Sequence, residues 1–330
     1  MSSGSVAAMP LDRNAVTFSA CYDARSFRSR TAIFVGQRTA DGSVSMPRRS
    51  PAAAGSVLYV PDVPSGSRVT AWRPGVPGLA EVFHATFTDH AYPSHTHDAW
   101  TLLVVDAGAI RYDLDRHAHG AARSEVTLLP PGVPHDGRAH TPAGFRKRVL
   151  YLDADTLGED RVGSAVDRPT LEDPTLRARL SQLHAALAPR TETLEAESRL
   201  ALVLDRLRQH LAGAVAPPPV VRDDVLADRL RDLLDARTVD GLGLAEAGEL
   251  LGAPPTHLVR CFTRRHGLPP HRYLTGRRLD RARRLLLDGV PAAQVAPAVG
   301  FYDQAHLTRH FRRLLATMPA AYARSARLPG

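Results

Sequence analysis

Short apolar runs alternate with turn residues between residues 67 and 155. The runs read LAEVFHATF, AWTLLVVDAG, AIRYDLD, EVTLLPPG and RKRVLYLD, and Gly or Pro separates them. Several short strands at close spacing, with turns between them, are typical of a β-sandwich or a β-barrel. We therefore predict that residues 67–155 form a β domain.

The apolar period becomes helical after this region. Asp173 followed by Pro174 is a helix start, and it predicts a helix that ends near Ala188. The next stretch, residues 194–211, carries one apolar stripe at helical spacing. The members of the stripe are Leu200, Val203, Leu204, Leu207 and Leu211. This helical linker, residues 170–215, either pairs with its copy in a second subunit or caps the β domain.

The first 66 residues are rich in Ser, Ala, Gly, Pro and Arg and show little periodicity, apart from TAIFVGQ, which could be a short strand. We expect a disordered extension here.

Cys21 and Cys261 are too far apart in sequence to suggest a disulfide framework or a zinc motif, and Cys261 occupies an apolar helix position. No apolar run approaches membrane-spanning length, so we expect a soluble, cytoplasmic protein without membrane contacts.

The C-terminal region, residues 222–330, contains one helical motif twice. THLVRCFTRR at 256–265 matches AHLTRHFRRL at 305–314 at an offset of 49 positions. The shared pairs are His257/His306, Leu258/Leu307, Arg260/Arg309, Phe262/Phe311 and Arg264/Arg313. Each copy follows a shorter predicted helix and a turn, at Gly252 and at Gly300. Two helix-turn-helix units are therefore predicted.

A helix-turn-helix places its second helix in the major groove, where Arg and Gln recognise guanine and adenine edges. In each copy the Leu and Phe share the buried face, and the repeated Arg lies on the outer face. Two units in one chain can reach successive major grooves, about 34 Å apart. The residues predicted to contact DNA are Thr256, His257, Val259, Arg260, Arg264, Gln304, His306, Thr308, Arg309 and Arg313.

Charge supports a polyanionic partner for this region. Residues 241–330 contain 14 Arg, no Lys and five acidic residues, which gives a net charge of +9. Because the whole chain carries +8, the first 240 residues carry −1. A basic domain joined to a nearly neutral one is typical of proteins that bind nucleic acid.

About 85 C-terminal residues resemble the AraC/XylS family of transcriptional regulators. The matching elements are Leu258-x-Arg260-x-Phe262, Gly267-x-x-Pro270-x-x-Tyr273, Arg278-Leu279-x-x-Ala282-x-x-Leu285-Leu286, Gly300-Phe301, Leu307-x-Arg309-x-Phe311 and Pro319-x-x-Tyr322. Three positions depart from the family pattern. Gly248 replaces the usual Ala, Pro297 lies inside the first helix of the second unit, and Ala316 replaces the usual Gly.

Histidines mark a candidate pocket in the β domain. YPSHTHDAW and LPPGVPHDG place His95, His97 and His135 near strand ends, which is the pattern of a cupin barrel and is similar to the effector-binding domain of AraC-type regulators. We predict a ligand pocket lined by His95, His97, Trp100 and His135. Metal-binding cupins have a glutamate four or five positions after the HxH, where this chain has Thr101 and Leu102. We therefore expect no metal or other cofactor, although three imidazoles could hold one.

These observations predict a multidomain α+β protein with a cupin-like N-terminal β-barrel, a helical linker and a C-terminal all-α double helix-turn-helix. The resemblance implies a sequence-specific transcriptional regulator rather than an enzyme. Its implied partners are double-stranded promoter DNA and a small-molecule effector, with RNA polymerase as a further candidate and a homodimer as the assembly. The alternatives are a metal-dependent cupin enzyme fused to a DNA-binding domain, and a regulator whose barrel only dimerises.

Overall fold

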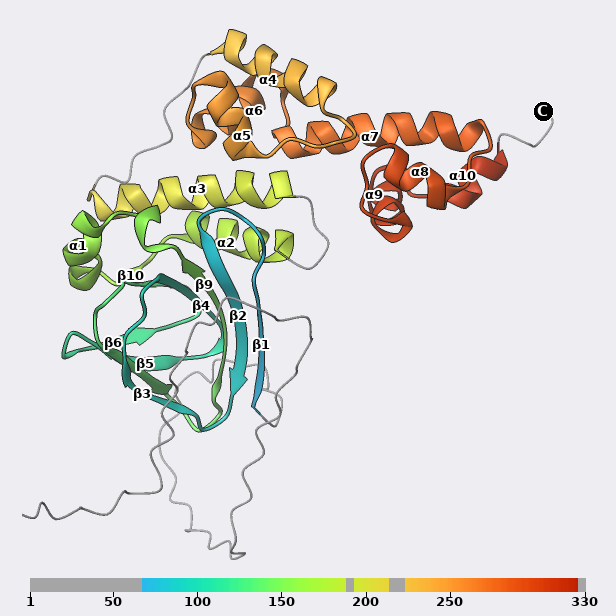
Figure 1. Ribbon diagram of the computed structural model, residues 1–330. Coiled ribbons are helices and arrows are strands. Elements are labelled where there is room, and N and C mark those ends of the chain that lie inside the picture. The colour runs from blue at the N-terminus through green and yellow to red at the C-terminus, as the bar shows by residue number, and fades with distance from the viewer. Residues whose placement is uncertain (1–66, 188–192, 214–222, 326–330) are drawn as a thin grey trace, which may run out of the picture. The chain divides into compact units, whose positions relative to one another are not determined.

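The computed structural model describes residues 67–187, 193–213 and 223–325. The predicted N-terminal extension, its candidate strand at residues 31–37, and Cys21 lie outside these ranges. The part that is described begins with strands and ends with helices (Figure 1). The prediction of a β domain followed by a helical helix-turn-helix region is confirmed.

The β domain consists of two antiparallel sheets. One has six strands in the order β1 (Arg68–Trp72), β2 (Leu79–Phe87), β9 (Phe145–Leu152), β4 (Trp100–Gly108), β7 (Val126–Leu129) and β10 (Thr170–Leu171). The other has four strands in the order β3 (Ala91–His95), β8 (His135–Ala139), β5 (Ile110–Leu114) and β6 (His117–Ala121). The five apolar runs of the sequence correspond to β2, β4, β5, β7 and β9, the longest of which build the six-stranded sheet.

Both faces of the six-stranded sheet are buried along its central strand β4, where successive residues point to opposite faces. In β4, Leu102 and Val104 belong to the hydrophobic core that includes the helices. Leu103 and Val105 belong to a second core with residues of the four-stranded sheet. Burial on both faces explains why the sequence of β4 is continuously apolar instead of alternating.

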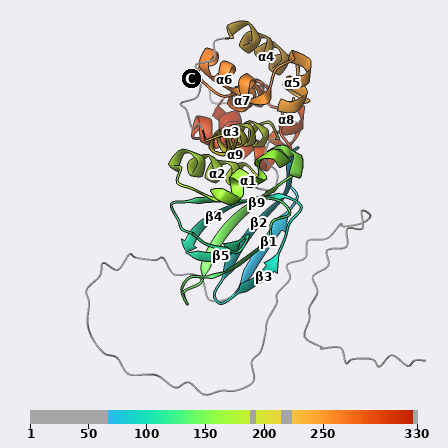
Figure 2. The same ribbon diagram turned by 90° about the vertical axis from the view of Figure 1, so that its left-hand side faces the viewer.

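Helices cover one face of this sheet. After the short α1 (Val162–Asp167), α2 (Pro174–Ala186) begins where Asp173 accepts hydrogen bonds from the backbone N–H groups of Thr175 and Leu176, as the sequence predicts. α3 (Thr193–Leu211) lies beside α2 in Figures 1 and 2. The predicted stripe of α3 packs into the core of the β domain, so it caps this domain.

The C-terminal region is entirely helical in the part described. Its helices are α4 (Asp224–Ala236), α5 (Leu244–Leu251), α6 (Pro255–His266), α7 (Pro270–Leu287), α8 (Ala292–Ala298), α9 (Gln304–Leu315) and α10 (Pro319–Ser325). Leu258 and Phe262 of α6 lie in one core, and Leu307 and Phe311 of α9 lie in another. The structure therefore contains two helix-turn-helix units, α5–α6 and α8–α9, which α7 connects.

The three departures from the family pattern have local consequences. A Cβ on Gly248 would lie 3.0 Å from the carbonyl oxygen of Ala253, so glycine suits the close turn between α5 and α6. Pro297 lies one residue before the end of α8, which spans only seven residues. The helix thus ends one residue beyond the proline. Ala316 ends α9 in the left-handed conformation, with φ of 55°, where glycine is favoured.

Candidate functional site

A cavity of about 120 Å³ lies between the two sheets of the β domain. Its walls combine apolar and aromatic side chains with a small number of polar groups. β9 contributes Phe145, Lys147, Val149 and Tyr151, because every second residue of the strand points inward. Apolar and aromatic walls with a few polar groups are typical of a ligand site.

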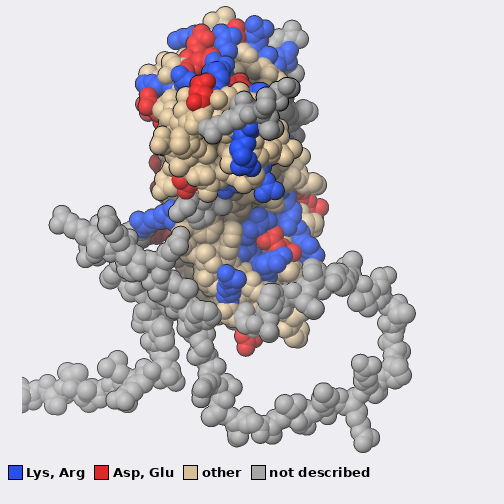
Figure 3. Space-filling model, turned by 90° about the vertical axis from the view of Figure 1, so that its right-hand side faces the viewer, with Lys and Arg blue, Asp and Glu red and all other residues tan. Residues whose placement is uncertain are grey.

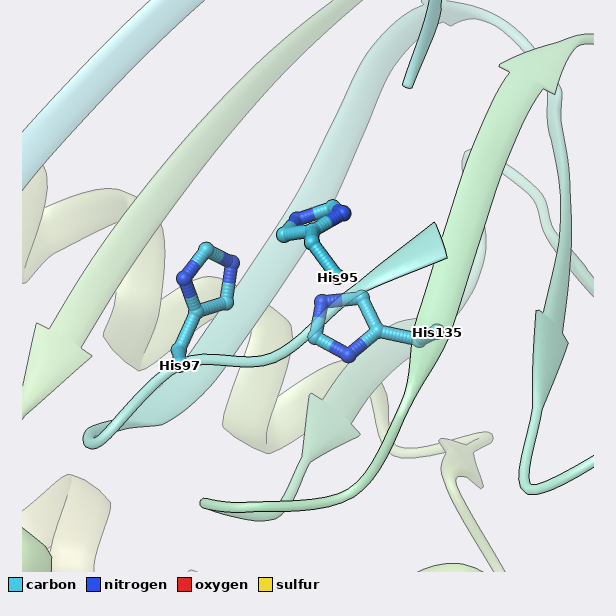
Figure 4. Close-up of side chains that lie close together, drawn as sticks. All are labelled: His95, His97 and His135. Carbon is cyan, nitrogen blue, oxygen red and sulfur yellow. The ribbon is translucent and has the colours of Figure 1, made fainter. Parts of the chain in front are cut away.

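Three histidines meet at one side of this cavity (Figure 4). His95 ends β3 and His135 begins β8, and the two are direct partners across these strands. His97 belongs to the loop after β3. The ligand atoms of the three side chains lie within 4.8 Å of one another. The structure thus brings together the three histidines that the sequence predicts.

Hydrogen bonds fix the ring protons of two of these histidines. The Nδ1 atom of His95 lies 2.7 Å from the carbonyl oxygen of Pro93, and that of His135 lies 3.0 Å from the carbonyl oxygen of Val133. A carbonyl oxygen only accepts, so each ring donates from Nδ1 and, when neutral, keeps Nε2 as an acceptor. Burial, aided by the neighbouring His135 and His95, lowers the pKa of His97 to about 4. Burial also lowers the pKa of His135.

The three imidazoles have the composition of a site for a divalent metal ion. No carboxylate of the described residues joins their group. Asp98, the nearest carboxylate in sequence, is exposed, and Thr101 and Leu102 occupy the positions of the glutamate of metal-binding cupins. The prediction that the ligand binds without a metal stays a prediction.

Lys147, the single lysine of the chain, is the charged group inside the cavity that the sequence reasoning missed. Its side chain is buried, and burial lowers its pKa to about 8. Its Nζ atom lies 4.2 Å from the centre of the Tyr92 ring. The alternation of β9 places Lys147 on the same face as Phe145 and Val149. This alternation along the strand was the sequence signal that could have identified Lys147 as an inward-facing residue.

Trp100 does not line the cavity, so that part of the predicted pocket is wrong. Its ring is fully buried in the core between the six-stranded sheet and the helices, and its Nε1 donates a hydrogen bond to the carbonyl oxygen of Ala154. Adjacent residues of a strand face opposite sides, so Thr101 points into the cavity instead.

The second helix-turn-helix unit presents an open surface on α9. Residues that the sequence predicts to contact DNA line a groove there, together with their neighbours Ala305 and Arg312. They are Gln304, Thr308, Arg309 and Arg313. His306 is different, because it is buried beside Phe301 and its Nε2 lies 3.1 Å from that of His310. His306 supports the helix from within, and its predicted position on the DNA-facing surface is wrong.

The corresponding face of α6 in the first unit is covered. Val259 is only 3% exposed, and the hydroxyl of Thr256 donates a hydrogen bond to the carbonyl oxygen of Ala201 on α3. Arg260 pairs with Asp205, also on α3. The expectation that these side chains face solvent is wrong, because α3 lies against them. Two other predicted DNA contacts remain more accessible: Arg264 is exposed, and His257 lies 3.6 Å from Asp223.

α3 makes further contacts with the first unit. Leu194 belongs to the core that contains Leu258 and Phe262. A carboxylate oxygen of Glu197 accepts a hydrogen bond from the backbone N–H of Leu244, the first residue of α5. This side chain occupies the place of a helix cap, which Gly243 cannot provide. α3 is therefore bound to α5 and α6 through apolar, polar and ionic contacts.

Charge alone does not outline the DNA-binding surface. On the face shown in Figure 3, basic side chains are scattered among acidic ones. The ion pairs of α6 and α4 show the same mixing, since Arg265 contacts Asp228 at 3.3 Å. The grooves and helix faces, more than the net charge, define the candidate surface.

Comparison with known proteins agrees with both regions. Residues 78–204 match the AraC-like ligand binding domain, and residues 248–325 match a helix-turn-helix domain. The HTH-type transcriptional regulator YbfI of Bacillus subtilis (strain 168) is 28% identical over 233 residues, which are 66% of this chain and 81% of that protein. The probable transcriptional regulator LumQ of Photobacterium leiognathi is 30% identical over 82 residues, which are 24% of this chain and 33% of LumQ.

Among solved structures, the AraC-like transcriptional activator CuxR is 19% identical and has a TM-score of 0.38, with 66% of this chain and 80% of that chain covered. The two matched domains and the relative YbfI define a DNA-binding transcriptional regulator with a ligand-binding domain. The ligand-binding domain is thus of the AraC-like type, the C-terminal domain is a helix-turn-helix domain, and the alternative of a cupin enzyme is not favoured. No helix in the described ranges has the length and apolar character needed to cross a membrane.

Proposed function

We propose that α6 and α9 are the DNA-reading helices, and that a small molecule in the β-domain cavity controls them through α3. The observation that carries this proposal is that α3 packs in two hydrophobic cores. Its residue Leu200 packs in the core of the β domain, whereas Leu194 packs in the core of the first helix-turn-helix unit. A ligand that changes the packing of the β domain thus has a direct route to α6.

DNA and α3 compete for the same face of α6. A recognition helix contacts base edges through its outer residues, and on α6 these are Thr256, Val259 and Arg260, all of which contact α3 or lie beneath it. The groove on α9 remains open. We infer that the covered state binds DNA through α9 alone, and that release of α6 adds the second reading helix.

Selection of duplexes from a random pool with the full chain tests this proposal. We expect Arg309→Ala to weaken binding to the selected sequence by about 1–3 kcal/mol, since it removes a base or phosphate contact. We expect Asp205→Ala to strengthen binding without any effector, because it loosens the cover on α6. Asp155→Ala is the matched control, as it removes one exposed negative charge from the β domain. Equal affinities of Asp205→Ala and Asp155→Ala would contradict the role of α3.

The remaining assignments follow from this function. We propose that the protein acts in the cytoplasm as a homodimer on promoter DNA, without catalytic activity of its own. RNA polymerase is a candidate partner at the promoter. The ligand-binding residues proposed are His95, His97 and His135 with the newly found Lys147, and the proposed DNA contacts are those of α6 and α9 other than His306.

A further inference from the structure

The cavity of the β domain holds polar groups without partners. The hydroxyl of Tyr92 and the hydroxyl of Thr101 are both buried, and within the part of the chain that is described neither has a hydrogen-bond partner. Both side chains line the cavity. Buried polar groups are nearly always hydrogen-bonded, so these two hydroxyls, together with that of Thr127 in the same lining, are available to a polar molecule in the cavity.

Lys147 lies in the same cavity without a counterion. No carboxylate in the described ranges forms an ion pair with it, and its neighbours are the rings of Phe83, Tyr92 and Phe145. The carboxylate that lines the cavity is that of Asp136, which already accepts hydrogen bonds from the backbone N–H of Asp113 at 2.7 Å and from Arg138 at 3.1 Å. Neutral pH lies below the lysine's pKa of about 8, so the ammonium group is charged.

We propose that the effector is a small hydroxycarboxylic acid whose carboxylate is bound by Lys147. This inference rests on the proposed function, in which a ligand of this cavity controls DNA binding. An anion neutralises the buried ammonium group, and a charge-assisted hydrogen bond is the strong type. The hydroxyls of Tyr92 and Thr101 donate to the same ligand.

The histidines define the other end of the ligand. The rings of His95 and His135 donate from Nδ1 to backbone carbonyl groups, which leaves Nε2 of a neutral ring to accept. A hydroxyl group of the ligand provides the donor that these atoms require. The cavity of 120 Å³ corresponds to about four water molecules, so the acid has a short carbon chain.

A metal ion is the competing occupant of the histidine side. Lys147 lines the same cavity as the histidines, and after burial its positive charge contributes to the lowered pKa of His97 and of His135. The same charge repels a divalent cation at the histidines. An anion bound at Lys147 neutralises this positive charge. The cavity therefore favours an anionic ligand over a metal ion.

Thermal unfolding of the full chain tests the proposal. The probes are glycolate, L-lactate, inorganic phosphate and the neutral 1,2-propanediol, each at the same series of concentrations. We expect glycolate or lactate to raise the unfolding midpoint of the wild type, and 1,2-propanediol to leave it unchanged. Lys147→Met should weaken the binding at least tenfold. Arg146→Met is the matched control, because it removes the adjacent, outward-facing charge of β9 and should bind like the wild type.

Two further measurements keep the test decisive. Thr101→Val preserves the shape of a cavity residue and should weaken carboxylate binding several-fold, even if Lys147→Met does not fold. Zn²⁺ or Mn²⁺ alone, added to the wild type and to His97→Ala, reports on the metal. The proposal is wrong if neither acid stabilises the wild type, if Lys147→Met binds as well as the wild type, or if phosphate or a metal ion alone stabilises the protein.

Measurements of DNA binding distinguish a failure of the proposed ligand class from a failure of the proposed function. If neither acid binds but Asp205→Ala still strengthens DNA binding, the ligand class is wrong and the control through α3 stands. If lactate or glycolate binds in a Lys147-dependent way but leaves the affinity for selected DNA unchanged, the cavity is an anion site and the proposed control is wrong.

Discussion

The guanidinium group of Arg260 donates a hydrogen bond to the carboxylate of Asp205, which lies 55 residues earlier on α3. The side chain of Arg260 is only 16% exposed. Arg309, its counterpart in the second copy of the motif, lies on an exposed surface and lines the groove of α9. Two arginines at equivalent positions of a repeat therefore have different surroundings, and the difference comes from α3.

This difference predicts that removal of α3 increases the effect of Arg260→Ala on DNA binding and leaves the effect of Arg309→Ala unchanged. In the fragment of residues 223–330, Arg260→Ala should cost about 1–3 kcal/mol of DNA affinity, because a base or phosphate contact is lost. In the full chain the same change also breaks the ion pair with Asp205, so the net loss should be smaller. Arg309→Ala should cost the same in both proteins. Affinity for a selected duplex is the measurement, and an equal loss from Arg260→Ala in both proteins would contradict the cover by α3.

Salt should weaken DNA binding by the isolated fragment strongly. Residues 241–330 contain 14 Arg against five acidic residues, and binding to phosphates releases condensed counterions. With six to ten phosphate contacts, affinity should fall by about 10³ to 10⁵ between 50 and 200 mM salt. Arg313→Ala should lower the slope of log affinity against log salt by about one. Affinity that does not change over this range would show that phosphates contribute little.

The sequence predicted the two helix-turn-helix units because their cores depend on local patterns. Leu258 and Phe262 follow helical spacing, and Gly252 allows the left-handed turn, with φ of 64°. The prediction that α2 starts at Asp173 also depended only on neighbouring residues. These features need only a few neighbouring residues, so periodicity and caps suffice to find them.

The sequence predicted the three histidines of the cavity, but it did not predict the other residues that surround them or the cover on α6. The position of Trp100 was wrong because a strand with both faces buried gives no alternation from which to choose the inward face. The cover on Val259 depends on α3, which is far from α6 in sequence. The role of Lys147 depends on the pairing of β9 with β2 and β4, which places its side chain in the cavity.

Replacement of Ala316 by glycine should stabilise the protein. It is exposed and ends α9 with φ of 55°, a conformation that costs residues other than glycine roughly 1 kcal/mol. We expect Ala316→Gly to raise the free energy of unfolding by about 1 kcal/mol, measured by urea denaturation. Ala320→Gly is the control, because it places glycine inside α10 and should lower stability by a similar amount. A loss of stability in Ala316→Gly would show that this turn has another constraint.

The histidine group should contain no tightly bound metal in the purified full chain. The described residues supply three imidazoles but no carboxylate, and Lys147 places a positive charge in the same cavity. Mass spectrometry of metals in protein purified without chelators is the measurement, with His97→Ala as the control. One equivalent of iron, zinc or manganese that disappears in His97→Ala would contradict this prediction and would favour the enzyme alternative.

Lys147 should destabilise the unliganded protein at neutral pH. Burial lowers its pKa from 10.5 to about 8, so between these values the unfolded chain binds more protons than the folded protein. The cost is therefore fully present below pH 8 and disappears as pH rises toward 10.5. A shift of this size corresponds to roughly 3 kcal/mol.

Lys147→Met removes the buried charge, so it should be more stable than the wild type by up to about 3 kcal/mol at pH 7. The difference should shrink as the pH approaches 10.5. Urea denaturation at pH 7, 8.5 and 10 measures it, with Arg146→Met as the control. The other titratable groups that line the cavity are common to both proteins, and they are His95, His97, His135, Asp136, Tyr92, Tyr112 and Tyr151. A constant difference across this pH range would mean that the gain comes from packing of the methionine and not from the charge of Lys147.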